Sequence, residues 1–160
     1  MTACPHCGHV APVVLRSWET WIDAKVESAN VTRSNHGAAH HAYRNKRDQW
    51  MMRWRLAKWT GDGPGQPSIR GVATTGHGLC TGRVTAGDGG KRYVVFTRHY
   101  TGREREMDHA NLVAGMKGPV DAMVRVGLLV DDSPKWFEAE YVQIKSDRSG
   151  LHVRIEERAE

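Results

Sequence analysis

The most chemically suggestive residues of this sequence are a set of carboxylates with a lysine among them. Asp108 stands where an extended stretch gives way to a helical pattern, and Asp131 and Asp132 follow the short apolar run after that pattern. Because the chain reverses between these points, the two acidic ends could meet. Carboxylate oxygens are the ligands that Mg²⁺ and Mn²⁺ prefer, and convergent carboxylates can hold such an ion beside a phosphodiester. Lys117 could offset the charge of that phosphate.

A purely structural interpretation explains the same residues one at a time. Asp108 would cap a helix, and Lys117 would pair with Asp121 one turn further along it. The two adjacent aspartates would form a solvated turn. This interpretation gives no reason for the order in which Asp-x-x-Asn, Lys-x-x-x-Asp and Asp-Asp follow one another.

That order resembles the RusA-like Holliday junction resolvases, including their phage-borne members. In that family an Asp-x-Asp-Asn-Leu motif precedes a helix with Lys-x-x-x-Asp, a glycine ends the helix, and an Asp-Asp pair follows. Residues 28–31 and the basic segment after them also resemble the amino-terminal region of the family, so the resemblance spans about residues 20–156. The matching motif residues are Asp108, Asn111, Leu112, Lys117, Asp121, Ala122, Gly127, Leu128, Asp131, Asp132 and Ser133.

The resemblance implies an endodeoxyribonuclease that depends on Mg²⁺ or Mn²⁺ and resolves four-way DNA junctions by paired nicks. It also implies a homodimer, which fits two symmetric cuts because they need two symmetric active sites. Asp108 and Asp132 would be the metal ligands. The other candidate catalytic residues are Lys117, Asp131, Asp121 and Glu106.

One residue departs from the motif of the family. Ala110 stands in place of the second aspartate, and its methyl group cannot bind a metal ion. If residues 103–108 are extended, alternation places Glu104, Glu106 and Asp108 on one face, so Glu106 could replace the missing carboxylate. Two other functions stay open: a junction-binding protein that has lost its metal site, and a zinc-bearing adaptor for nucleic acid or protein.

A second candidate metal site involves the cysteines. Cys4 and Cys7 have the spacing of a zinc knuckle, and His77 and Cys80 repeat that spacing, so together they predict a structural Cys₃His zinc site. The alternative is a frayed amino terminus with free thiols. Because three cysteines cannot all pair within one chain, they also favour a reducing cytoplasm, that of the host if the gene is phage-borne. The competing fourth ligands are His9, His36, His40 and His41.

Positive charge is concentrated early in the chain. There are 23 Lys and Arg residues against 18 Asp and Glu residues, giving a net charge of +5, and Asp48 is the only acid between residues 33 and 58. Trp50, Trp54 and Trp59 lie among the basic residues. Two interpretations remain open: phosphate contact with base stacking, or an amphipathic helix with buried tryptophans and solvated charges. The candidate DNA contacts are Arg33, Arg44, Lys46, Arg47, Arg53 and Arg55.

The pattern of elements predicts an α+β fold, with a single mixed sheet, two main helices and the short amino-terminal knuckle. We expect residues 1–12 to form the knuckle segment and residues 13–160 one RusA-like endonuclease domain. No apolar run approaches the roughly 18 residues of a membrane span, and the amino terminus has no secretory signal. The predicted strands are within 13–31 and at 79–85, 92–100, 136–145 and 151–155, and the predicted helices are 40–59 and 111–126, the second kinked or restarted at Pro119.

Overall fold

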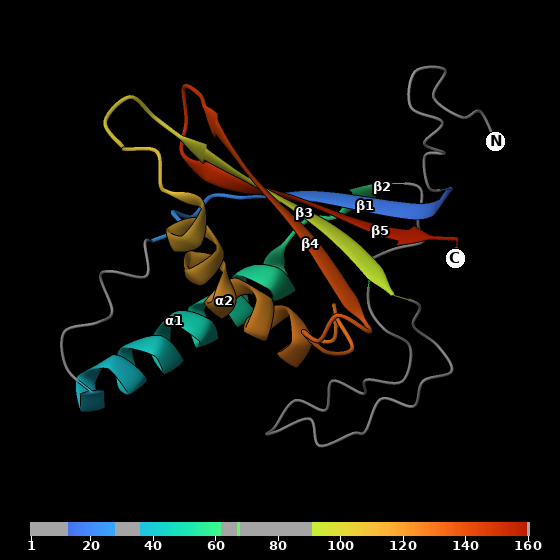
Figure 1. Cartoon of the computed structure of the whole chain (residues 1–160), viewed down its shortest axis with the longest axis horizontal. Coiled ribbons are helices and arrows are strands. Elements are labelled where there is room, and N and C mark those ends of the chain that lie inside the picture. Colours follow the sequence, from blue (N-terminus) through green and yellow to red (C-terminus); the bar gives the residue numbers. More distant parts are fainter. Residues whose placement is uncertain (1–12, 28–35, 62–66, 68–90, 160) are drawn as a thin grey trace.

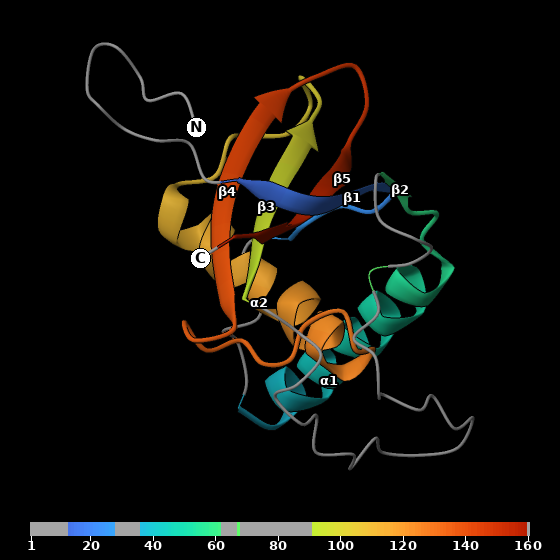
Figure 2. The ribbon, with the colours of Figure 1, turned by 90° about the vertical axis from the view of Figure 1, so that its right-hand side faces the viewer.

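The computed structural model describes residues 13–27, 36–61, 67 and 91–159. In these ranges a five-stranded sheet carries two helices, and Figures 1 and 2 show both helices on the same side of it. None of the described helices combines the length and the apolar character that a membrane crossing requires. The elements are β1 (Val14–Ile22), α1 (His36–Leu56), β2 (Thr60–Gly61), β3 (Arg92–Tyr100), α2 (His109–Arg125), β4 (Phe137–Lys145) and β5 (Gly150–Arg158).

The strands follow the spatial order β2-β1-β5-β3-β4. β5 is antiparallel to both of its neighbours, β1 and β3, whereas β3 and β4 are parallel. A parallel pair needs a crossover connection, and α2 provides it. The predicted α+β class, with one mixed sheet and two helices, is therefore confirmed.

Alternation along the strands builds the core. Val94 and Phe96 of β3 and Val153 and Ile155 of β5 are fully buried, and each lies opposite a buried residue of the neighbouring strand. The residues between them point to the other face of the sheet. The helices cover the inner face with apolar side chains, among them Trp50, Trp54, Leu112, Met116 and Met123.

The outward face of the sheet carries charged side chains that are already paired. Arg154 lies 2.8 Å from Glu156 and 3.6 Å from Glu19, and Arg158 lies 2.8 Å from the same Glu156. Opposite charges along β5, and between β5 and Glu19 of β1, thus neutralise one another on this face.

Helix α2 begins and ends as its sequence indicates. Its last turn closes at Gly127, whose φ of 77° suits glycine, and the Leu128 N–H donates to the Met123 carbonyl at 2.9 Å. The helix is one element across Pro119, so the predicted restart is not observed. Buried side chains on both sides of the proline, such as Met116 and Met123, stabilise the two halves together.

Some predicted boundaries differ. Residues 101–107 form turns and irregular backbone rather than an extended stretch, because the Glu104 N–H donates to the Thr101 carbonyl at 2.9 Å and reverses the chain. β1 ends at Ile22, well before residue 31, and β5 continues to Arg158 because it pairs with both β1 and β3. The predicted strand 79–85 and the predicted knuckle lie outside the described residues.

Candidate active site

Asp108 caps the amino terminus of α2. Its Oδ1 accepts a hydrogen bond from the Asn111 backbone N–H at 2.9 Å, and its Oδ2 accepts one from the Asn111 side-chain amide. These bonds, the backbone one above all, lower the pKa of Asp108 below its ordinary value. Asp108 is therefore a cap, as the structural interpretation held, and also an ionised carboxylate at the surface.

The backbone just before Asp108 is held by side chains from the sheet. The Gln143 amide brackets Met107: its Oε1 accepts the Met107 N–H at 3.1 Å, and its Nε2 donates to the Met107 carbonyl at 2.7 Å. Arg98, itself buried, donates to the same Gln143 oxygen at 2.8 Å. The position of Asp108 is thus set by β3 and β4.

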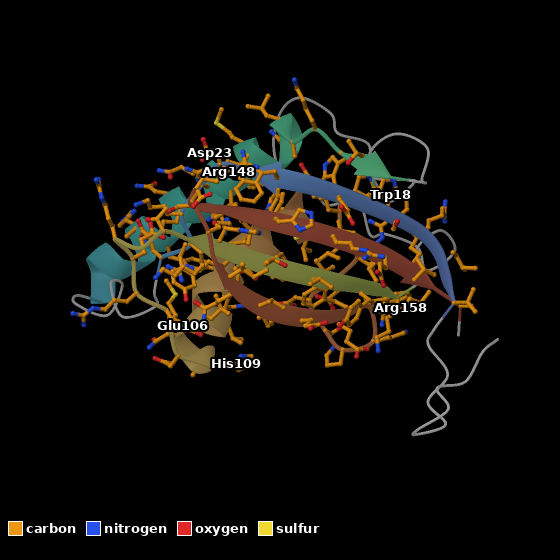
Figure 3. The ribbon with its side chains drawn as sticks, turned by 90° about the horizontal axis from the view of Figure 1, so that it is seen from above. Trp18, Asp23, Glu106, His109, Arg148 and Arg158 are labelled. Atoms are coloured by element: carbon orange, nitrogen blue, oxygen red, sulfur yellow. The ribbon has the colours of Figure 1, made fainter. Side chains whose placement is uncertain are left out.

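Glu106 lies beside this end of α2, and Figure 3 shows it near His109 at one end of the sheet. It is exposed, and its Oε2 is 3.4 Å from the Tyr100 hydroxyl. Residues 101–107 are not a strand, so the prediction that alternation places Glu104, Glu106 and Asp108 on one face is wrong. Glu104 instead pairs with Lys25 at 2.7 Å.

A lysine joins two of the predicted acidic motifs. Lys117 Nζ lies 3.3 Å from Asp121 Oδ1 and 3.7 Å from Asp132 Oδ2. The hydroxyl of Tyr43, from α1, donates to Asp121 Oδ2. The structure therefore brings together residues from the Lys-x-x-x-Asp motif, the Asp-Asp pair and the basic helix.

Asp131 shapes the turn next to this cluster. Its Oδ1 accepts the Asp132 N–H at 2.8 Å, and this bond is the largest of the causes that lower the pKa of Asp131. Both aspartates are exposed. The turn thus presents two adjacent carboxylates to solvent.

Asp108 is not part of that arrangement. Lys117 lies nine residues after it, about 13 Å along the helix axis. Within residues 13–27, 36–61, 67 and 91–159, no three His, Cys, Asp or Glu side chains are close enough to share a metal ion, so Asp108, Asp131 and Asp132 do not form such a group. In the described residues, the three aspartates therefore do not form a shared metal site.

The basic helix α1 resolves one open alternative. Trp50 and Trp54 are only 7% and 1% exposed, so they belong to the core and cannot stack on bases. The amphipathic interpretation is correct for these two tryptophans.

The basic residues of α1 differ in their partners and in their exposure to solvent. Lys46 pairs with Glu27, Arg47 lies 3.2 Å from Asp48, and Arg53 lies over Trp50. Arg44 and Arg55 are exposed, whereas Arg33 lies outside the described residues.

Sequence reasoning missed Tyr43, Arg98 and Gln143. A signal existed for Arg98, because it shares the inward parity of Val94 and Phe96, and a charged residue at such a position must find partners. The contact of Tyr43 with Asp121 joins residues far apart in sequence, which no local pattern reveals.

The predicted zinc ligands Cys4, Cys7, His77 and Cys80 lie outside the described residues. Comparison of the chain with protein-family models, with curated proteins and with solved structures finds no match.

Proposed function

We propose that this protein is a metal-dependent endonuclease of the RusA-like type that cuts branched DNA. The observation that carries the proposal is the contact of Lys117 with Asp132. These residues are 15 positions apart and belong to two different motifs of the resemblance, and their side chains lie 3.7 Å from one another. Capping and turn formation alone would not require the two motifs to meet.

The charge distribution supports DNA contact on the helix side. Arg154 and Arg158 on the open face of the sheet are already paired with carboxylates, whereas Arg44 and Arg55 of α1 are exposed. Tyr43, next to Arg44, reaches the Lys117 cluster. A duplex held through its phosphates by α1 would lie beside the acidic turn, with an affinity that falls steeply as salt rises.

The donor chemistry of the turn suits Mg²⁺. This ion keeps several waters and binds through one or two carboxylates together with substrate phosphates. Asp132 and Asp131 would hold it. When bound, the ion would lower the pKa of a water molecule and polarise the phosphodiester. Lys117 would neutralise charge that develops on the phosphate.

The paired cuts of a resolvase require two such sites, and a homodimer would supply them. The experiment is a cleavage assay on a synthetic four-way junction and on a linear duplex of the same length, in Mg²⁺, Mn²⁺ or EDTA. We expect symmetric nicks in the junction alone and only with a divalent ion. Absence of cutting in both metals would contradict the proposal.

Ala110 favours a second function. It is exposed in the first turn of α2, where the resemblance expects a carboxylate. A protein that binds junctions without cutting them would show junction binding in EDTA and no nicks in either metal. A zinc-bearing adaptor that does not act on DNA would fail both measurements.

A further inference from the structure

We propose that Tyr43 is a positioning residue that acts through Asp121 to fix the ammonium group of Lys117 beside Asp132. The catalytic consequence of this role rests on the proposed function, whereas the positional link does not. Tyr43 comes from α1, and the three other residues come from α2 and the turn that follows it.

Asp121 lies where it can connect Tyr43 to Lys117, and its oxygens are not free to bind a metal ion. Both of its oxygens have donors within the protein: Oδ1 faces the Lys117 ammonium at 3.3 Å, and Oδ2 accepts from the Tyr43 hydroxyl. Its side chain is 24% exposed, whereas that of Asp132 is 46% exposed. The carboxylate of Asp121 is therefore oriented by Tyr43 and oriented toward Lys117.

The side chain of Lys117 needs a fixed partner to hold its ammonium group in one position. Its side chain is 63% exposed and has four rotatable bonds, so its ammonium group can occupy many positions in the absence of a fixed partner. An exposed ion pair one helical turn apart restrains a lysine only weakly. A carboxylate held by a second bond from another helix is a firmer partner than a freely rotating one.

Tyr43 stays a hydrogen-bond donor over the useful pH range. Burial, the hydrogen bond to Asp121 and the negative charges of Asp121 and Asp132 all raise its pKa well above the ordinary value for tyrosine, against a smaller lowering by Arg47. The hydroxyl therefore remains protonated and cannot act as a base at neutral pH.

The helix that carries Tyr43 is itself fixed. The Trp54 indole donates to the Pro119 carbonyl at 3.0 Å, and Trp50 is buried against the same core. Arg44, the residue next to Tyr43, is exposed and available to a phosphate. The hydroxyl that orients the lysine thus lies one residue from a proposed DNA contact.

The test compares two tyrosines that make the same kind of bond. Tyr43→Phe removes the bond to Asp121, and the control Tyr93→Phe removes a hydroxyl that donates to Glu140 at 2.5 Å on the open face of the sheet. With saturating junction and Mg²⁺, we expect kcat to fall roughly tenfold in Tyr43→Phe and to stay near wild type in Tyr93→Phe. Junction affinity in EDTA should change less than about twofold in both.

A double-mutant cycle separates positioning from a merely structural role. If Tyr43 acts through Lys117, Tyr43→Phe should cause little further loss of kcat in a Lys117→Ala background. Equal losses in both backgrounds would overturn the proposal. So would a Tyr43→Phe variant that unfolds at lower temperature but keeps the wild-type kcat.

A second readout does not depend on activity. The NMR signal of the Lys117 Cε methylene should shift in Tyr43→Phe and not in Tyr93→Phe. If the wild type does not cut junctions but this shift occurs, the proposed function fails and the positional link stands. If the wild type cuts and neither the signal nor kcat changes, the positional link is wrong.

Discussion

The indole N–H of Trp54 donates to the carbonyl oxygen of Pro119 at 3.0 Å, and this bond joins α1 to α2. Both residues are almost completely buried. Because the indole N–H and the carbonyl are both shielded from water, this bond contributes more to the packing of the two helices than an exposed one would. The relative placement of the basic helix and the acidic turn depends on it.

Trp54→Phe should therefore destabilise the fold by about 0.5–1.5 kcal/mol for the lost hydrogen bond, with a further loss of packing. Urea unfolding measures the change. Trp59→Phe is the matched control, because Trp59 stacks on Trp54 while its Nε1 has no hydrogen-bond partner in the part of the chain that the structure describes. Equal losses in the two variants would show that the bond to Pro119 contributes nothing measurable.

Asp132→Asn should abolish junction cutting and leave junction binding in EDTA close to wild type. The substitution removes a proposed metal ligand and also a charge that the phosphate would repel. Asp147→Asn, at an exposed position in the loop between β4 and β5, is the control and should cut normally. Full activity in Asp132→Asn would exclude this aspartate from the site.

Two substitutions at Asp108 separate capping from metal binding. Asparagine keeps an oxygen that can accept the Asn111 N–H, so Asp108→Asn should retain much of the cap, whereas Asp108→Ala should lose it. If Asp108 also binds the ion, both variants should need more Mg²⁺ for half-maximal cutting. An unchanged Mg²⁺ requirement in both would leave Asp108 as a cap only.

The lowered pKa of Asp108 should also make the stability of the fold depend on pH. The folded-state pKa of Asp108 lies below the unfolded value of about 3.9, so the ionised form stabilises the fold fully above that value. This contribution should be lost as the pH falls below about 4 and passes through the folded-state pKa. The stability difference between wild type and Asp108→Asn should therefore shrink on acidification, as thermal unfolding at pH 7 and pH 3 would measure.

If the ion is bound at the Asp108 end of α2, Ala110→Asp should lower the Mg²⁺ concentration needed for half-maximal cutting, because it restores the carboxylate of the family motif. The position is exposed in the first turn of α2, where a negative charge also favours the helix. If Glu106 has taken over the role, Ala110→Asp should gain little and Glu106→Gln should be inactive. If neither substitution changes cutting or its Mg²⁺ requirement, the metal ion is bound elsewhere.

Purified protein should contain about one zinc ion per chain, bound by Cys4, Cys7, Cys80 and His77, since the two pairs share the spacing of a two-knuckle site. Elemental analysis of wild type beside Cys4→Ser and Cys80→Ser measures this. Zinc lost only in Cys4→Ser would mean that the second pair of ligands is different, and no zinc in wild type would refute the site.

The sequence pattern correctly predicted helix α2, whose formation depends on interactions between residues close together in the chain. The apolar spacing through Leu112, Met116 and Met123 and the stop at Gly127 predicted α2 because they act over one or two turns. The alternation of Glu104, Glu106 and Asp108 wrongly predicted an extended segment. A strand needs a neighbouring strand to pair with, and the turn after Tyr100 ends that pairing.

The site was less predictable than the fold. The structural interpretation correctly predicted that Lys117 pairs with Asp121 one helical turn away. That Asp132 and not Asp108 lies beside the lysine depends on how the turn after Gly127 folds back along α2, which the spacing of the motifs does not reveal. The partnership of Tyr43 with Asp121 likewise depends on the packing of α1 against α2.

The place of β5 between β1 and β3 has a consequence for the growing chain on the ribosome. Among the strands that the structure describes, β5 comes last in sequence, yet it is the strand that joins the β1–β2 half of the sheet to the β3–β4 half. Until it emerges, both halves expose unpaired backbone and apolar inner faces. Synthesis that stops within the loop at residues 146–149 would release a chain whose two strand pairs share no sheet, which chaperones and proteases recognise as incompletely folded.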